Sequence, residues 1–398
     1  MEQMQYCLRV RGEHAAADTA FLSRGKIQAV TAFHKTLPGY APTPLVKLND
    51  LAQTLGVASV YLKDESKRFG LNAFKALGGS WAIADYLKQT LALDGEVTFE
   101  RLRAALEGRE PITFITATDG NHGRGVAWTA RVLGQKAIVY MPKGSAAERL
   151  ENIRAQGAQA KITEYNYDDT VRMAARDAEE NGWVLVQDTA WPGYETIPTR
   201  IVQGYGTLAM EIVEQLGEER PTHLFLQAGV GSFAGAVLGC MVETYGKDYP
   251  ITTIMEPDKA DCVYRSAAAD DGKLHFVTGD MDTMMAGLAC GEPCTVVWPV
   301  LNSYGDAFVS CDDETAAQGM RLLGKPEGSD PVVVSGESGA VGAGLLARIM
   351  SGRYEPLRKA LKLDETSRVL LISTEGDTDR ENYKKIVFGA FRENHKDS

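Results

Sequence analysis

Between residues 112 and 255, short apolar runs alternate with longer stretches in which apolar positions recur every three or four residues. The short runs predict strands and the longer stretches predict helices, because side chains repeat every two residues along a strand and about every 3.6 along a helix. The expected strands are 112–117, 137–140, 161–164, 183–186, 224–227 and 251–255, and the expected helices are 121–133, 145–157, 169–180, 199–216 and 232–245. Such alternation is typical of βαβ units and a parallel sheet.

The pattern continues on both sides of this region. A strand is expected at 58–62, a helix begins near Leu77, and a strand at 369–373 follows helices at 314–323 and after Glu337. Ser145-Ala-Ala-Glu148 has the spacing of a capping box, which predicts the start of a helix. The first 40 residues are expected to be irregular, and residues 257–310 show no clear period.

Together these elements predict an α/β protein of two doubly wound domains with mainly parallel sheets. Residues 85–190 would form the smaller domain. The larger, cofactor-binding domain would be discontinuous, because it would take residues 1–84 and 191–398.

Composition narrows the function. The chain has 398 residues, of which 44% are hydrophobic and 24% charged, as in a globular protein. A net charge of −11 without a basic stripe argues against nucleic acid as a partner. The start of the chain lacks a signal-peptide core, and no apolar run approaches the roughly 20 residues of a membrane helix, so a cytoplasmic location is expected.

The six cysteines do not predict a disulfide framework in so long a chain. Cys290 and Cys294 have a spacing that could suggest a metal site. No second pair and no histidine cluster accompanies them, so no metal is expected. Reduced thiols are the simpler interpretation.

Lys75 is the first residue whose surroundings indicate chemistry. It follows Phe74 in the stretch Lys63-Asp-Glu-Ser-Lys-Arg-Phe-Gly-Leu-Asn-Ala-Phe-Lys and precedes the apolar helix near Leu77. A lysine among apolar and small residues is poorly solvated, which lowers its pKa and suits it to Schiff-base chemistry with an aldehyde. The alternative is a surface lysine that caps a helix.

Gly229-Val230-Gly231-Ser232 follows an apolar strand and opens a helix. Such a turn presents bare N–H groups and the positive end of a helix to an anion, most often a phosphate. Gly229-x-Gly231-x-x-Ala234 also fits a dinucleotide fingerprint, with Glu256 placed as a ribose-binding acid. An NAD-dependent oxidoreductase is therefore an alternative, although it leaves Lys75 unexplained.

Two more turns follow predicted strands. Asp119-Gly120-Asn121-His122 begins a helix, where its glycine allows a ligand to approach the backbone and Asn121 can donate or accept a hydrogen bond. Ser373 ends the last apolar strand and could offer a neutral hydroxyl to a ring nitrogen. Each turn alone is also explained as an ordinary strand end or capped helix.

In their order and spacing these stretches resemble the fold-type II pyridoxal-phosphate enzymes, the group of tryptophan synthase β chain and threonine dehydratase. The likeness runs from about Pro42 to Asp379 and includes Thr-Asp-Gly-Asn-His-Gly, Tyr-Met-Pro-Lys-Gly-Ser, Val-Gln-Asp-Thr-Ala-Trp and Ser-Thr-Glu-Gly-Asp-Thr-Asp. It implies pyridoxal 5'-phosphate as the cofactor and a homodimer. It also implies a Schiff base on Lys75, next to Phe74.

The same resemblance implies further contacts with the cofactor. Asn121 would bond its phenolic oxygen and Ser373 would face its ring nitrogen. Gly229, Val230, Gly231 and Ser232 would hold its phosphate.

The turn at Asp119 bears on the substrate. Members of the family that act on serine or threonine usually have a hydroxyl residue there, and an aspartate would repel a substrate carboxylate by about 4 kcal/mol at 4 Å and an effective dielectric of 20. A second ammonium on the substrate would turn repulsion into attraction. Asp188, in another strand-end turn, is a second candidate carboxylate, and Gly120 and His122 complete the expected substrate contacts.

The resemblance therefore implies α,β-elimination from 2,3-diaminopropionate, which gives pyruvate and ammonia. Lys75 is the expected base on one face, and Asp119 is either a second base or the partner of the β-ammonium. The alternatives are a serine or threonine dehydratase, the NAD-dependent oxidoreductase, and a catalytically silent sensor that keeps the fold.

Overall fold

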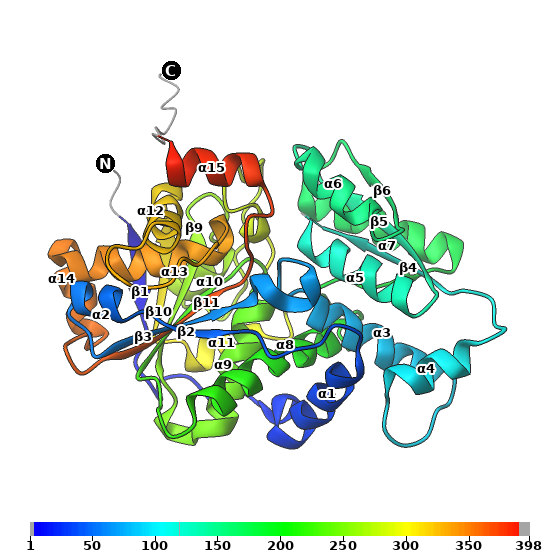
Figure 1. Cartoon of the computed structure of the whole chain (residues 1–398), viewed down its shortest axis with the longest axis horizontal. Coiled ribbons are helices and arrows are strands. Elements are labelled where there is room, and N and C mark those ends of the chain that lie inside the picture. The colour runs from blue at the N-terminus through cyan, green and yellow to red at the C-terminus, as the bar shows by residue number, and fades with distance from the viewer. Residues whose placement is uncertain (1–3, 119, 390–398) are drawn as a thin grey trace.

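Two sheets organise the chain, and the computed structural model describes residues 4–118 and 120–389 (Figure 1). The larger sheet has seven strands in the order β1-β10-β9-β8-β11-β3-β2. Its five inner strands are parallel, and the edge strands β1 and β2 are antiparallel to their neighbours. The strands are β1 Gln5–Leu8, β2 Leu45–Lys47, β3 Ser59–Asp64, β8 His223–Gln227, β9 Ile251–Pro257, β10 Ala307–Cys311 and β11 Arg368–Ser373.

The smaller sheet has four parallel strands in the order β6-β5-β4-β7. In Figure 1 it lies to the right of the larger sheet, with α5, α6 and α7 around it. Its strands are β4 Thr113–Ala117, β5 Lys136–Met141, β6 Gln159–Ile162 and β7 Val184–Leu185. The predicted α/β class with mainly parallel sheets is confirmed, while the exact division into residues 85–190 and the remainder stays a prediction.

Helices cover both sheets. They are α1 Arg24–Thr36, α2 Asn49–Leu55, α3 Ala76–Thr90, α4 Phe99–Leu106, α5 Asn121–Val132, α6 Ala147–Arg154, α7 Tyr167–Asn181, α8 Thr196–Leu216, α9 Ser232–Tyr245, α10 Cys262–Ala269, α11 Trp298–Tyr304, α12 Asp313–Gly324, α13 Glu337–Arg348, α14 Glu355–Ala360 and α15 Arg380–Phe388. Among the described residues, no helix is long and apolar enough to span a bilayer.

Buried strands explain why the apolar runs were continuous rather than alternating. Every residue of β8 and of β10 is buried, as expected for inner strands covered by helices on both faces. The carboxyl ends of β4, β8 and β11 lead into the three turns singled out above. In open α/β sheets, ligands bind beyond such strand ends.

We call the smaller sheet with its helices the smaller lobe, and the larger sheet with its helices the larger lobe. Helix α3, which begins directly after Lys75, packs against α5 from the smaller lobe and against α8 from the larger one. Glycines make the approach possible: a Cβ at Gly204 would collide with the backbone oxygen of Leu77, and one at Gly125 would lie 2.8 Å from Cα of Ala76. Neither position has room for a methyl group, so both helices meet α3 backbone to backbone.

A buried network of charges lies just before Lys75. Arg68 forms ion pairs at 2.7 Å with both Glu65 and Glu211, and Lys63 forms another with Glu211 at 2.7 Å. All four side chains are at most 2% exposed. Because an unpaired buried charge is very costly, this network fixes the segment that leads from β3 to Lys75.

Two expectations were wrong. The first 40 residues are not irregular, because they contain β1 and α1, and α1 buries Ile27, Val30 and Phe33 on one face. The helix predicted from Ser145 begins at Ala147, since the Ser145 hydroxyl donates to the oxygen of Pro142 and caps nothing. Residues 257–310, for which the sequence predicted no elements, contain α10, α11 and part of β10.

Candidate active site

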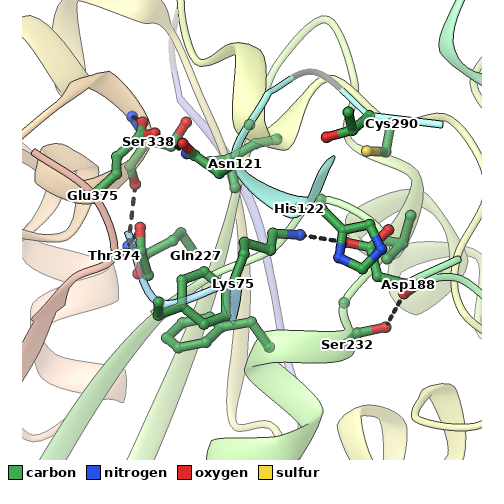
Figure 2. Close-up of a pocket in the computed structure, with 18 of the residues that line it drawn as sticks. Lys75, Asn121, His122, Asp188, Gln227, Ser232, Cys290, Ser338, Thr374 and Glu375 are labelled. Carbon is green, nitrogen blue, oxygen red and sulfur yellow. Dashed lines mark hydrogen bonds and ion pairs between the residues drawn. The ribbon is translucent and has the colours of Figure 1, made fainter. Parts of the chain in front are cut away.

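Lys75 extends into a cavity between the strand ends (Figure 2). Its ammonium forms an ion pair with Oδ2 of Asp188, and its side chain is 17% exposed. The backbone before it is paired with the end of β11, because Phe74 N donates to the oxygen of Thr374 at 3.2 Å and Ala73 forms a bridge with Glu375. The lysine is thus fixed between strand ends rather than free on the surface.

The described residues that line this cavity are Phe74, Lys75, Thr118, Asn121, His122, Tyr167, Asp188, Gln227, Gly229, Val230, Gly231, Ser232, Phe233, Gly287, Leu288, Cys290, Ser338, Thr374 and Glu375. They come from both lobes, since Asn121 begins α5 of the smaller one and Gly229–Ser232 lead into α9 of the larger one. Most residues predicted from separate turns are therefore brought to one place.

Asp188 is the best-supported acid of the cavity. Its Oδ1 accepts from Tyr167 Oη at 3.2 Å and from Gln187 Nε2 at 3.3 Å, while Oδ2 faces Lys75. Burial alone would raise the pKa of Asp188, but the charge of Lys75, acting together with His122 and with the hydrogen bonds from Lys75 and Tyr167, holds that pKa below its ordinary value. The carboxylate is ionised and gives Lys75 a fixed counter-charge.

His122 lies beside this pair as a neutral ring. Its Nε2 donates to the oxygen of Val186 at 2.8 Å, because a carbonyl can only accept. Burial lowers the pKa of His122, although Asp188 opposes the shift. The other nitrogen, Nδ1, is then an acceptor, and among residues 4–118 and 120–389 it has no hydrogen-bond partner.

The glycine turn forms the wall at the start of α9. Gly231 has φ +93°, a conformation that favours glycine, and a Cβ there would lie 2.8 Å from Cδ1 of Leu301. The first N–H groups of a helix have no partner within it and carry the positive end of the dipole. Ser232 starts the helix, and its hydroxyl donates to the oxygen of Asp188 at 2.6 Å. This wall suits a phosphate.

A second cluster lies on the other side of Lys75 in Figure 2. Asn121 Nδ2 donates to Glu375 Oε2 at 2.5 Å, and the backbone N–H of Ser338 donates to Glu375 Oε1 at 3.2 Å. The Ser338 hydroxyl is buried on the cavity wall and has no partner within the described ranges. It is a second polar atom that a bound ligand would satisfy.

Ser373 and Gly120 are predicted site residues that do not line the cavity. Ser373 is fully buried and its hydroxyl donates to Ser335 Oγ at 2.7 Å, so the expected hydroxyl beside the ring nitrogen is not on the wall. Its neighbour Thr374 is, with Oγ1 accepting from Gln227 Nε2 at 3.0 Å. Asp119 lies outside the described residues.

The structure does not support Glu256 as the ribose-binding acid of the alternative dinucleotide site. Glu256 is buried and does not line the cavity, and it accepts hydrogen bonds from the backbone N–H groups of Val263 and Tyr264 at 3.0 and 2.5 Å. Burial raises the pKa of Glu256 well above its ordinary value. The residue caps α10 and offers nothing to a ribose.

Cys290 lines the cavity, but within the described part of the chain no cluster of side chains could hold a metal ion. Sequence reasoning missed Tyr167, Gln227, Ser338, Thr374 and Glu375 as wall residues. Glu375 and Thr374 belong to the Ser-Thr-Glu-Gly-Asp stretch that carried the resemblance, which was a usable signal. Ser338 and Tyr167 lie at the starts of helices far from the other site residues in the sequence, and no sequence signal marked them as wall residues.

Comparison with known proteins agrees with this geometry. The model of a family described as "Pyridoxal-phosphate dependent enzyme" matches residues 36–375. A diaminopropionate ammonia-lyase of Salmonella typhimurium is 55% identical over 368 residues, which are 90% of this chain and 91% of that protein. The family model covers the Lys75 segment, the glycine turn and the end of β11.

Solved structures give the same result. Holo diaminopropionate ammonia lyase from Escherichia coli is similar with a TM-score of 0.91 and 48% identity, over 97% of each chain. A complex of that enzyme with an aminoacrylate-PLP azomethine reaction intermediate has a TM-score of 0.88 and 47% identity, again over 97% of each chain. The family model and these similarities span most of the sequence, so the chain belongs to the pyridoxal-phosphate dependent enzyme family.

Proposed function

We propose that this chain is a diaminopropionate ammonia-lyase, which eliminates ammonia from 2,3-diaminopropionate and yields pyruvate. The observation that carries the proposal is Lys75 paired with Asp188 in a cavity whose opposite wall is the glycine turn at α9. The high identity to a protein of that activity selects it within the family. A serine or threonine dehydratase is not favoured, because relatives of that kind are only about a quarter identical.

The cavity fits pyridoxal phosphate. Gly229, Val230, Gly231 and Ser232 would hold the phosphate at the start of α9. Asn121 would donate to the phenolic oxygen, and Phe74 would contact the ring. Two buried polar atoms of wall residues, His122 Nδ1 and Ser338 Oγ, have no hydrogen-bond partner in the described residues, so a polar ligand could bond them. When bound, this cofactor supplies an electron sink for a carbanion at the substrate α-carbon.

Lys75 and Asp188 would handle protons in this site. Nζ of Lys75 is the group placed to take the substrate α-proton once it is neutral. Oδ2 of Asp188 then accepts a hydrogen bond from the resulting ammonium and stabilises its charge. Tyr167 and Gln187 hold the other carboxylate oxygen, so Oδ2 keeps its direction towards the lysine.

Asp119 would complete the selection of substrate. We assign it to the β-ammonium of 2,3-diaminopropionate or to proton removal on the face opposite Lys75, an assignment that rests on its place between Thr118 and Gly120. A negative charge there suits a substrate with a second ammonium. It would repel the carboxylate of serine or threonine, which lack that ammonium, by up to about 4 kcal/mol. Gly120, His122 and Asp188 would be its neighbours at the substrate.

Pyruvate release from 2,3-diaminopropionate, compared with turnover of serine and threonine at equal concentrations, tests this function. We expect the diamino acid to be preferred by at least about a hundredfold in kcat/KM, which corresponds to roughly 2.7 kcal/mol. Equal rates on serine would contradict the substrate assignment while leaving the family intact. A homodimer and a cytoplasmic location, supported by the family likeness and by composition, stay predictions; sedimentation as a monomer would count against the first.

A further inference from the structure

A side-chain hydrogen bond that the proposed reaction does not use joins the two lobes across the cavity. Asn121 is the first residue of α5, and Glu375 lies just beyond β11, 254 residues further along the chain. Asn121 Nδ2 donates to Glu375 Oε2 at 2.5 Å. Both side chains line the cavity, so this hydrogen bond lies on the wall that a bound ligand would contact.

The chemistry of the pair fixes which way the amide points. An ionised carboxylate can only accept hydrogen bonds, whereas an asparagine amide has an NH₂ end and an oxygen end. Glu375 therefore selects the rotamer in which the NH₂ of Asn121 faces it. That NH₂ carries a second N–H, which the same rotamer directs at a fixed angle to the first.

Glu375 is itself well fixed. Its side chain is buried, its Oε1 accepts from the N–H of Ser338 at 3.2 Å, and its Oε2 also lies 3.4 Å from Thr378 Oγ1. Its backbone forms a bridge with Ala73, two residues before Lys75, and its oxygen accepts from Gly336 N at 3.0 Å. Because both its backbone and its carboxylate are held by hydrogen bonds, Glu375 can fix the orientation of the side chain that donates to it.

We infer that Glu375 is a positioning residue for the cofactor: it holds the Asn121 amide so that the second N–H meets the phenolic oxygen of pyridoxal phosphate. The inference rests on the proposed contact between Asn121 and that oxygen. The backbone of Glu375 also forms the bridge to Ala73 in the Lys75 segment, so one residue adjoins both the polar and the covalent attachment of the ring.

A double-mutant cycle on cofactor affinity tests the inference. Asn121→Ala should raise the dissociation constant for pyridoxal phosphate roughly tenfold, the worth of one hydrogen bond to a charged oxygen. Glu375→Gln should weaken binding by up to the same factor, because glutamine has an NH₂ in place of one of the two oxygens that now accept separately from Asn121 and Ser338, so a donor would face a donor. In the Asn121→Ala background, Glu375→Gln should add less than about twofold, since its effect passes through the missing amide.

The absorption spectrum of the bound cofactor gives a second readout, because it reports the protonation of the phenolic oxygen. Asn121→Ala and Glu375→Gln should change the ratio of the absorption bands in the same direction. Glu375→Asp keeps an acceptor-only group and should recover part of the wild-type ratio and affinity. It also replaces Glu375→Gln in the cycle if that variant does not fold.

Glu256→Gln is the matched control, because Glu256 is an equally buried carboxylate that accepts from backbone N–H groups at a helix start but does not line the cavity. It should leave the spectrum unchanged. The inference is overturned if Glu375→Gln weakens cofactor binding as much in the Asn121→Ala background as it does when Asn121 is intact. It is also overturned if Asn121→Ala or Glu375→Gln leaves affinity and spectrum as in wild type. Neither result affects the substrate proposal, which is decided by turnover on 2,3-diaminopropionate.

Discussion

Asp188 and Glu375 are both carboxylates on the cavity wall, and Figure 2 places them on opposite sides of Lys75. Asp188 faces a cation, the ammonium of Lys75, whereas Glu375 accepts from two neutral donors, the Asn121 amide and the N–H of Ser338. The same chemical group therefore has two roles. In our proposal one carboxylate balances a charge that the reaction needs, and the other fixes the direction of the Asn121 amide.

This difference predicts how each responds when only its charge is removed. An amide at position 188 leaves a partly buried ammonium without its counter-charge, which is costly. An amide at position 375 leaves a neutral donor unsatisfied, which costs less. Substitutions on the Asp188 side should therefore reduce turnover, and those on the Glu375 side should reduce cofactor affinity.

The largest effect is expected from Asp119, which we place on the reaction side of the comparison. Asp119→Asn keeps the size and removes the charge, and should reduce kcat on 2,3-diaminopropionate by about 10²- to 10⁴-fold while the cofactor and its colour remain. Asp119→Ser should narrow the preference over serine by part of about 4 kcal/mol. Because asparagine caps a helix as well as aspartate does, near-wild-type turnover of Asp119→Asn would mean that Asp119 is only a cap.

Asp188→Asn should come next. Without the counter-charge, the ammonium form of Lys75 is less stable, and we expect kcat to fall about a hundredfold. Cofactor affinity, measured by titration of the apoprotein, should change less than in Glu375→Gln. If Asp188→Asn weakened cofactor binding more than turnover, the two carboxylates would not differ as described.

Tyr167→Phe gives a smaller effect on the same side. It removes the hydroxyl that donates to Asp188 Oδ1 at 3.2 Å and accepts from Gln187 Nε2 at 2.9 Å. Loss of one such bond costs about 1 kcal/mol, so turnover should fall by roughly fivefold. If Tyr167→Phe reduced turnover by the same factor in the Asp188→Asn background, Tyr167 would act independently of Asp188.

Glu337, a buried carboxyl near Glu375, should make the stability of the protein depend on pH. Burial, and then the charge of Glu375, raises the pKa of Glu337 to about 7 from an ordinary value of 4.5. The folded protein therefore keeps a proton that the unfolded chain releases, and the stability from this group is full below about pH 4.5 and lost as pH rises through 7. Glu337→Gln cannot ionise, so relative to wild type its unfolding free energy should be higher at pH 8 than at pH 5, by on the order of 3 kcal/mol. Thermal melts of the two proteins at pH 5 and pH 8 measure this difference. The same difference in stability at both pH values would contradict the prediction.

Local signals explain what could be predicted from the sequence. Asn121 and Ser232 were expected to begin helices after apolar strands, and they are the first residues of α5 and α9. Each such turn needs only an apolar run, a glycine and a helical period, all within about a dozen residues. Since parallel strands bring their carboxyl ends to one edge, several separate turns predicted one site.

Polar residues that become buried explain the failures. The helix α1 was missed because Thr31 and His34 interrupt its apolar face, yet both are buried and each contacts Thr207, His34 through Nδ1 at 2.7 Å. Ser145 looked like a cap because a hydroxyl and a glutamate have the right spacing, but it bonds backwards to Pro142. Such choices depend on neighbours that a local pattern does not contain.

Long-range contacts were the least predictable part of the site. The bond between Asn121 and Glu375 joins residues 254 positions apart, and Ser338 meets Glu375 only because α13 begins beside β11. Ser373 was chosen from the strand end, and its contact with the ring nitrogen stays a prediction. Its neighbour Thr374 is the hydroxyl residue that lines the cavity, and the sequence pattern did not indicate it.

The central claim is that Lys75 carries the cofactor, and borohydride reduction followed by peptide mass analysis tests it most directly. Reduction of the yellow holoprotein should bleach its colour and leave a pyridoxyl group on the peptide that contains Lys75, while Lys75→Ala should give no labelled peptide. Lys63, buried in the charge network 12 residues earlier, is a lysine that should stay unlabelled. A pyridoxyl group on Lys63 or on any lysine other than Lys75, or a wild-type protein that reduction leaves unmodified, would contradict the account.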